Sequence, residues 1–228
     1  MIPWTLIDTA KIAGGGELRL KRRGQEFSIT LGGNELMNSR LSGSEEALAN
    51  LSCAKIRDRP HPKILIGGLG MGFTLRAALA QLPDDAAVTA AELVPEVVQW
   101  ARGPMAGVFA GCLDDPRVTI HEGDVGKLIG AQKGAWDAIL LDVDNGPEGL
   151  TVETNDGLYT RAGLAAAHAA LKPGGVLSVW SSAPDAGFTR RLSETGFEAG
   201  EHTVRAHGKR GARHVVWMAR KNDPYRIL

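Results

Sequence analysis

The chain has 228 residues, of which 43% are hydrophobic and 23% charged, and its 26 basic residues balance its 26 acidic residues. This length and hydrophobic content can bury one full core, so we expect one main domain with a small appendage and exclude a disordered chain. The balanced charge gives no net attraction to nucleic acid or to a membrane surface, so we expect neither partner. We also expect a cytoplasmic protein without a signal peptide or membrane helix, because long apolar runs are absent and the two cysteines, Cys53 and Cys112, lie far apart.

The N-terminal part of the chain has a pattern of its own. Residues 17–24 and 25–31 alternate apolar and polar side chains across a charged turn that contains glycine, which is typical of a β-hairpin. Ser42 or Ser44 can cap a helix that continues to about Leu51, and the prolines of residues 59–62 then interrupt the chain. We therefore predict a small N-terminal region of β-hairpin plus helix over residues 1–60 and a main domain over residues 61–228.

From residue 63 onward, short apolar segments alternate with segments that have helical spacing. Strands that are buried on both faces and separated by helices indicate a mostly parallel sheet with helices on each side, so the fold class is α/β and doubly wound. The last two strands flank a charged turn and predict an antiparallel hairpin at the sheet edge. The expected strands are 63–66, 87–92, 117–121, 138–141, 176–180, 197–206 and 212–219, and the expected helices are 73–81, 96–102 and 161–171.

A glycine-rich turn follows the first of these strands. The order Gly68-x-Gly70-x-Gly72 lets the backbone approach a nucleotide closely before a helix begins. Glu92 ends the next strand, and its separation from Gly72 along the chain is the spacing at which a carboxylate accepts hydrogen bonds from ribose hydroxyls. The glycine spacing differs from the G-x-G-x-x-G pattern of dinucleotide sites, so it favours a nucleoside without phosphates.

Carboxylates also follow the next two strands. Asp124 comes after the third strand, where its oxygen could accept from an adenine amino group, and Asp142 and Asp144 come after the fourth. Because the carboxyl ends of parallel strands meet at one edge, we expect these groups to share one crevice. Asp142 and Asp144 could instead cap the loop after the strand, since aspartate favours such turns. The histidines show no ligand-like spacing, and we predict no metal site.

Residues 63–182 resemble the S-adenosylmethionine-binding domain of the spermidine synthase family, within the Rossmann-like methyltransferase superfamily. The resemblance is carried by the glycine turn, by the order and spacing of conspicuous motifs, and by the Trp136-Asp137 pair that precedes Asp142. The motifs are Ala91-Glu-Leu-Val-Pro-Glu-Val-Val98, Asp115-Pro-Arg-Val-Thr-Ile-His-Glu-Gly-Asp124, Leu158-Tyr159-Thr160 and Leu171-Lys-Pro-Gly-Gly-Val-Leu177.

The resemblance implies a Rossmann-like class I methyltransferase fold with a mostly parallel seven-stranded sheet and a C-terminal antiparallel hairpin. It also implies a ribose role for Glu92, an adenine role for Asp124, and a place for Asp142 at the reacting centre as the catalytic residue. For the acceptor, we take Asp144, Asn145 and Tyr159 as candidate residues, although an aromatic side chain at a helix start more often packs in the core. The expected residues for S-adenosylmethionine, or for its decarboxylated form, are Gly68, Leu69, Gly70, Met71, Gly72, Glu92, Leu93, Gly123, Asp124 and Asp142.

Three departures from the family pattern decide the expected reaction. Met71 stands where the family has an aspartate, Asn145 follows Asp144 where the family spacing is Asp-x-x-Asp, and Leu48 and Asn50 fall at the family's Tyr-x-Glu segment. We therefore expect a methyltransferase that acts on a small-molecule acceptor, with Asp142 orienting or deprotonating the acceptor.

Two alternatives stay open. One is an aminopropyl transferase that uses decarboxylated S-adenosylmethionine and a diamine such as putrescine. The other is a non-catalytic nucleoside-binding protein that has kept the cleft and lost the acceptor site. The N-terminal hairpin offers a strand edge, so we also expect a homodimer.

Overall fold

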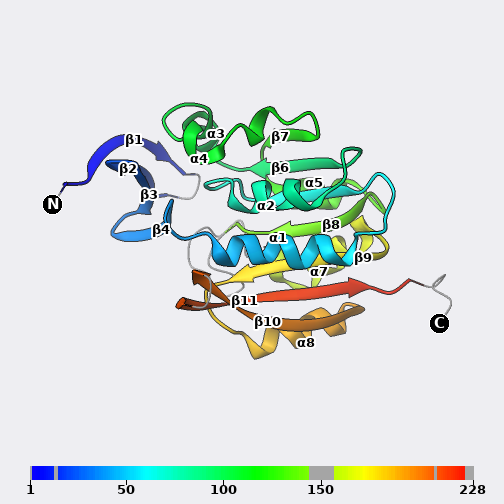
Figure 1. Cartoon of the computed structure of the whole chain (residues 1–228). Coiled ribbons are helices and arrows are strands. Elements are labelled where there is room, and N and C mark those ends of the chain that lie inside the picture. The colour runs from blue at the N-terminus through cyan, green and yellow to red at the C-terminus, as the bar shows by residue number, and fades with distance from the viewer. Residues whose placement is uncertain (1, 13–14, 144–156, 208–209, 224–228) are drawn as a thin grey trace.

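The computed structural model describes residues 2–12, 15–143, 157–207 and 210–223. Their largest element is a seven-stranded sheet with the order β10-β11-β9-β8-β5-β6-β7 (Figure 1). Five neighbouring strands are parallel, and β11 and β10 complete the sheet as an antiparallel hairpin. The predicted fold class is therefore confirmed. The strands are β5 (Lys63–Gly67), β6 (Ala87–Glu92), β7 (Val118–Glu122), β8 (Trp136–Leu141), β9 (Leu171–Ser181), β10 (Phe197–His207) and β11 (Arg210–Lys221).

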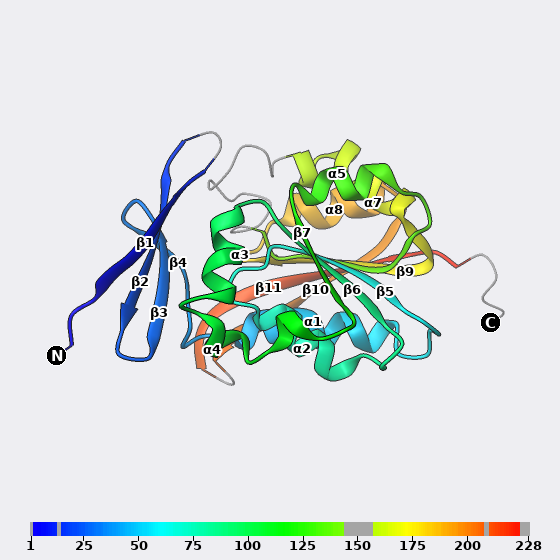
Figure 2. The same cartoon turned by 90° about the horizontal axis from the view of Figure 1, so that it is seen from above.

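Helices cover both faces of this sheet (Figure 2). One face carries α1 (Gly43–Lys55) and α2 (Phe73–Gln81), and the other carries α5 (Val125–Ala131), α7 (Arg161–Ala170) and α8 (Ala186–Glu194). Shorter connections add α3 (Pro95–Arg102), α4 (Ala106–Phe109) and the 3₁₀ turn η1 (Cys112–Asp114). In the described chain, no helix is both long enough and apolar enough to cross a membrane.

The sequence patterns missed α5 and α8, which begin at capping aspartates. Asp124 accepts a hydrogen bond from the Gly126 N–H at 2.7 Å, and Asp185 accepts from Gly187 and Phe188. Strand burial also differs from expectation at one place, because β7 lies at the sheet edge and is only partly covered. In contrast, all six residues of the central strand β8 are buried.

The N-terminal region forms a larger sheet than the predicted hairpin. Four antiparallel strands follow in chain order: β1 (Thr5–Lys11), β2 (Glu17–Arg23), β3 (Glu26–Leu31) and β4 (Asn34–Asn38). The predicted hairpin corresponds to β2 and β3. The arrowheads of β6, β8 and β9 in Figure 1 point toward this small sheet, so it lies beyond the carboxyl ends of the parallel strands.

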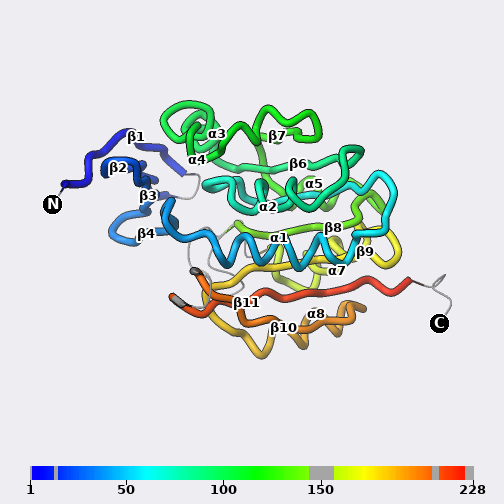
Figure 3. Tube along the Cα trace, viewed as in Figure 1, coloured from blue at the N-terminus to red at the C-terminus, as the bar shows by residue number. Residues whose placement is uncertain are grey.

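The helix α1 links the two sheets along the chain and packs on the larger one. Figure 3 traces its path from β4 across that sheet, where it contacts α2, β8, β9, β10 and β11. Ser52 of α1 donates a buried hydrogen bond to Leu48 O and lies 2.7 Å from the Ser178 hydroxyl of β9. The predicted domain boundary near residue 60 stays a prediction. Although α1 precedes that boundary in the chain, it packs against strands of the larger sheet.

Asp137, at the start of β8, connects three other parts of the chain at the amino-terminal end of the parallel strands. Its side chain is 2% exposed and accepts hydrogen bonds from Arg59 at 2.7 Å, from the Lys63 N–H at 2.8 Å and from the Lys172 ammonium. Burial alone raises the pKa of Asp137, but the hydrogen bonds from Lys172, Lys63 and Arg59 outweigh burial and hold that pKa below its usual value.

We predict that Asp137→Asn lowers the free energy of unfolding by about 2–4 kcal/mol at pH 7, because it leaves two cations without their carboxylate. The folded pKa is depressed, so this stabilisation is present above the unfolded pKa near 4 and is lost as the pH falls through the folded pKa. Urea unfolding at pH 7 and near pH 3 measures both effects. The exposed Asp58→Asn serves as control, and an Asp137→Asn protein as stable as its parent at pH 7 would contradict the prediction.

Candidate active site

The glycine turn between β5 and α2 brings backbone against backbone at the carboxyl end of the sheet. Gly68 has a φ of +88°, and a Cβ at this position would collide with the carbonyl oxygen of Asp142. The Gly68 N–H donates to Ala91 O at 2.8 Å, and the Asp142 N–H donates to Gly67 O at 2.9 Å. The turn is thereby fixed between the strand ends that carry Glu92 and Asp142.

Glu92 is a buried carboxylate that organises the rim of the crevice. It is 9% exposed and accepts the Leu69 N–H at 3.0 Å on one oxygen and the Val94 N–H at 2.9 Å on the other. Burial raises its pKa, and the backbone hydrogen bonds, led by that of Val94, oppose this change. Each carboxylate oxygen has a second lone pair, so Glu92 can still accept hydrogen bonds from a ligand.

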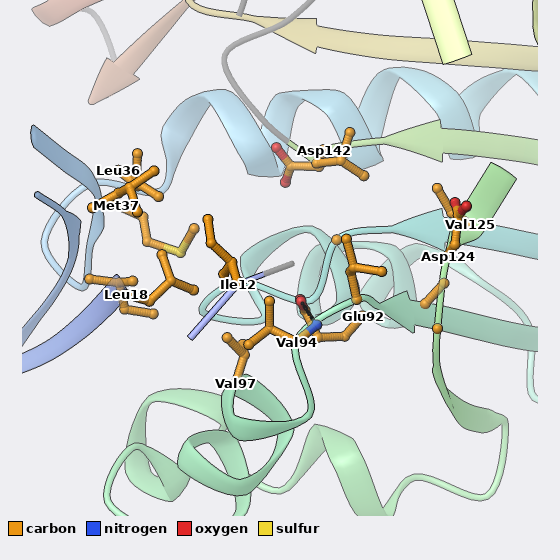
Figure 4. A pocket seen from close by; sticks show the side chains of 18 residues that line it. Ile12, Leu18, Leu36, Met37, Glu92, Val94, Val97, Asp124, Val125 and Asp142 are labelled. Carbon is orange, nitrogen blue, oxygen red and sulfur yellow. Dashed lines mark hydrogen bonds between the residues drawn. The ribbon is translucent and has the colours of Figure 1, made fainter. Parts of the chain in front are cut away.

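These strand ends form one wall of a cavity of about 810 Å³, a volume that includes its open mouth. In Figure 4, Leu18, Leu36 and Met37 lie on one side of this cavity, and Asp124 and Val125 lie on the other. The volume is within the range of small-molecule sites. Of the residues expected to bind the nucleoside ligand, those that line this cavity are Gly68, Gly70, Glu92, Leu93, Gly123, Asp124 and Asp142.

The small N-terminal sheet supplies the apolar wall of the cavity, which the sequence analysis did not predict. The only sequence signal for this wall is the alternation of apolar and polar residues in the hairpin. The alternation shows that one face of the hairpin is apolar, but it does not show what that face covers. The wall consists of Ile12, Leu18, Ile29, Leu31, Leu36 and Met37.

A second pocket of about 620 Å³ adjoins the first, and the two share Leu36, Met37, Gly70, Asp142 and Val143. Leu69 and Met71 of the glycine turn line the second pocket rather than the first, whereas Gly72 lines neither and packs against the ring of Phe109. The sequence analysis missed three further lining residues, which come from α1, α2 and β9: Glu45, Phe73 and Trp180.

Asp142 lies at the junction of the two pockets. The Thr74 hydroxyl donates to its Oδ2 at 2.6 Å. Burial and the negative charge of Glu45 raise the pKa of Asp142 to about 7, and the hydrogen bond from Thr74 partly offsets them. A carboxylate with this pKa can accept or release a proton near neutral pH.

The remaining candidates divide into two groups. Tyr159 is 4% exposed, stacks edge-on against Phe188 at 5.9 Å and lines neither pocket, so its acceptor role is not supported by its position. Asp144 and Asn145 lie outside the described residues. Leu48 is buried in the core and Asn50 is exposed, and neither of them lines either pocket.

Comparisons with known proteins agree with this geometry. The model of the spermine/spermidine synthase domain matches residues 43–186. A polyamine aminopropyltransferase of Nitrosomonas europaea is 37% identical over 125 residues, covering 55% of this chain and 36% of the relative. A spermidine synthase of Dictyostelium discoideum is 33% identical over 119 residues, covering 52% and 39%. The chain thus aligns with little more than a third of the length of these relatives.

Solved structures show the same fold over nearly the whole chain. The spermidine synthase of Thermotoga maritima superposes with a TM-score of 0.74 and 22% identity, covering 96% of this chain and 74% of that one. A spermidine synthase in complex with the transition-state analogue AdoDATO gives a TM-score of 0.75, also at 22% identity.

The expectation of methyl transfer to a small molecule is wrong, because the matched domain and the curated relatives are those of aminopropyltransferases, the stated alternative. That expectation rests on positions such as Met71, where the family has an acidic residue and this chain does not. The structure places another carboxylate, Glu45, in the same pocket as Met71. The fold, the glycine turn and the domain match together establish that this chain belongs to the spermine/spermidine synthase family.

Proposed function

We propose that this protein transfers the aminopropyl group of decarboxylated S-adenosylmethionine to an amine acceptor. The observation that carries the proposal is the charge of the lining. The described residues that line the two pockets include the carboxylates of Glu45, Glu92, Asp124 and Asp142 and contain no Lys, Arg or His. Residues 144–156 also have no Lys, Arg or His in their sequence.

This charge pattern favours the decarboxylated donor. S-adenosylmethionine itself carries a carboxylate, which would enter an acidic site whose described lining offers no cation to pair with it, and an unpaired buried charge is costly. The decarboxylated form has a sulfonium and an ammonium group, and both match the negative lining. An amine acceptor benefits from the same charge.

The donor-binding roles follow the family resemblance residue by residue. Glu92 would accept hydrogen bonds from the ribose hydroxyls, and Asp124 would accept from the adenine amino group with an oxygen that its helix cap leaves available. The backbone at Gly68 and Gly70 would allow close approach, and the apolar wall of the small sheet would contact the apolar carbon groups of the donor.

Asp142 is the proposed general base of the transfer. The neutral amine nitrogen attacks the propyl carbon next to sulfur, so an N–C bond forms while the C–S bond breaks and its electron pair stays on sulfur. The products are the aminopropylated amine and 5′-methylthioadenosine, and the surplus proton of the amine passes to the Asp142 carboxylate. A pKa of about 7 suits this task, because much of Asp142 is ionised at neutral pH.

Two other expectations stay predictions. The first is the homodimer, which the exposed apolar residues Leu6 and Ile7 on the edge strand β1 favour. The second is the cytoplasmic location.

Product analysis tests the proposed reaction directly. The purified protein is incubated with decarboxylated S-adenosylmethionine and a panel of amines that includes putrescine and butylamine, and products are identified by mass spectrometry. We expect equal amounts of 5′-methylthioadenosine and an aminopropylated amine. The parallel incubation with S-adenosylmethionine is expected to give no product, and absence of product from both donors would favour the non-catalytic alternative.

We predict that Asp142→Asn lowers kcat for aminopropyl transfer by about 100-fold or more, because asparagine cannot take the proton. The affinity for 5′-methylthioadenosine, measured by calorimetry, is expected to change little, since the nucleoside residues stay in place. The parent enzyme should lose kcat/KM below about pH 7, in line with the pKa of Asp142. An Asp142→Asn variant with parental kcat would remove Asp142 from the reaction.

The same substitution makes a separate prediction about stability. The folded pKa of Asp142 is raised above its unfolded value, so its contribution favours the folded state at acidic pH and is lost as the pH rises from about 4 to about 7. Asp142→Asn is therefore expected to be more stable than the parent by about 1–3 kcal/mol at pH 8 and equally stable near pH 4. Urea unfolding at the two pH values measures this difference, and a destabilised variant at pH 8 would contradict it.

A further inference from the structure

The small N-terminal sheet forms one wall of the first pocket, and a single directional contact joins it to the larger domain. Between the described residues, one hydrogen bond and no ion pair connect β1–β4 with the larger sheet and its helices. The indole N–H of Trp100 in α3 donates this bond to Asp8 Oδ2 in β1 at 2.7 Å. Figure 2 shows α3 on the side of the larger domain that faces the small sheet.

Both partners are suited to this contact. Trp100 is 2% exposed, and a buried indole N–H without an acceptor would be costly. Asp8 accepts it on Oδ2, while its Oδ1 accepts the Thr9 N–H at 2.8 Å, so both carboxylate oxygens are held in place. The hydrogen bonds from Trp100 and Thr9 lower the pKa of Asp8. Asp8 is therefore ionised near neutral pH, and an ionised acceptor makes the stronger hydrogen bond.

The pairing of β1 with β2 directs Asp8 toward α3. Asp8 lies opposite Leu20, whose side chain is fully buried, and residues opposite each other on antiparallel strands share a face. Asp8 therefore belongs to the inner, apolar face of the small sheet. A β-bulge between Leu6 and Asp8 breaks the alternation, so Leu6 turns to the outer face and is 54% exposed.

The two elements that carry this contact also line the first pocket. On the inner face of β1, Ala10 follows Asp8 and lies opposite Leu18, which is a lining residue. On α3, the lining residue Val97 precedes Trp100 by one helical turn, so the two side chains share a face of the helix. Asp8 and Trp100 themselves line neither pocket. Their hydrogen bond therefore fixes, from outside the pocket, the spacing between two parts of its wall.

Apolar contacts alone would leave this spacing less defined. Leu18 and Ile29 of the small sheet belong to the same hydrophobic cluster as Val97 and Trp100 of α3. Contacts of this kind favour burial without a preferred direction. A hydrogen bond, in contrast, requires its donor and acceptor to keep one geometry. The bond to Asp8 thus adds direction to an interface that is otherwise apolar.

We propose that Asp8 is a positioning residue of the donor pocket, which holds the small sheet against α3 through Trp100 and thereby sets the affinity for the nucleoside part of the donor. This role rests on the aminopropyl transfer proposed above and concerns a residue that does not touch the reacting groups. The helix α3 begins beside Glu92, whose Oε1 accepts the Val94 N–H, so Asp8 holds a helix that borders the carboxylate expected at the ribose. A wall that is already in place lowers the ordering cost of binding.

Three variants test this role. Asp8→Ala removes the acceptor, whereas Asp8→Asn keeps an oxygen at the same place. Thr9→Ala is the matched control, because Thr9 is the next residue of the strand, lies opposite Arg19 on the outer face and lines neither pocket. Both positions are exposed, so the variants are expected to fold. Calorimetry measures the affinity for 5′-methylthioadenosine, and the indole N–H resonance of Trp100 reports on the contact itself.

We expect Asp8→Ala to weaken 5′-methylthioadenosine binding about tenfold and to shift the Trp100 resonance. The KM for decarboxylated S-adenosylmethionine should rise by a similar factor, while kcat stays within about twofold because Asp142 is unchanged. Asp8→Asn should bind within about threefold of the parent, and Thr9→Ala should match it.

Parental affinity in Asp8→Ala, an unshifted Trp100 resonance, or an equal loss in Thr9→Ala would overturn the proposal. A lower calorimetric stoichiometry with an unchanged dissociation constant would also overturn it, because Asp8 would then only keep part of the protein folded. A parent that binds 5′-methylthioadenosine and forms no aminopropylated product would refute the proposed reaction and leave the positioning role to the binding data. A parent that does not bind this nucleoside would overturn both.

Discussion

The site depends on the parallel alignment of β5, β6, β7 and β8. Their register places Gly67 beside Ala91 and Leu141, and Glu92 beside Glu122, so the residues that follow these strands emerge at one level. Carboxylates that are far apart in the sequence, such as Glu92 and Asp142, thereby face one crevice. Burying these two carboxylates costs free energy, because each loses contact with water. This loss raises the pKa of both. A cationic ligand offsets that cost.

Segments outside the parallel strands complete the crevice and divide it. The small N-terminal sheet covers the first pocket with aliphatic residues, while α1 brings Glu45 to the second pocket. Both precede β5 in the chain, so the segment before the glycine turn contributes lining residues to both pockets. Asp142 is the carboxylate that lines both pockets, which places it where the proposed transfer needs a group to accept the proton.

Much of this arrangement could be predicted from the sequence, because it follows a local rule. Strand periodicity located Glu92, Asp124 and Asp142 at strand ends, and parallel strands bring such ends together. Glu45 and Trp180 could not be found in this way, since they reach the pocket through the packing of α1 and β9 rather than through a motif. The same limit explains the error about the reaction: an acid missing at Met71 was counted as a missing charge, although a neighbouring element carries one. Tyr159 shows the converse, because its motif is present and its ring packs in the core.

The central claim is that the crevice selects a donor without a carboxylate. Calorimetric titration of the purified protein with S-adenosylmethionine and with its decarboxylated form tests it most directly, since the two ligands differ by that one group. We predict that the decarboxylated form binds at least about tenfold more tightly, because the described lining holds acids and no cation. Equal affinity, or tighter binding of S-adenosylmethionine itself, would contradict the claim.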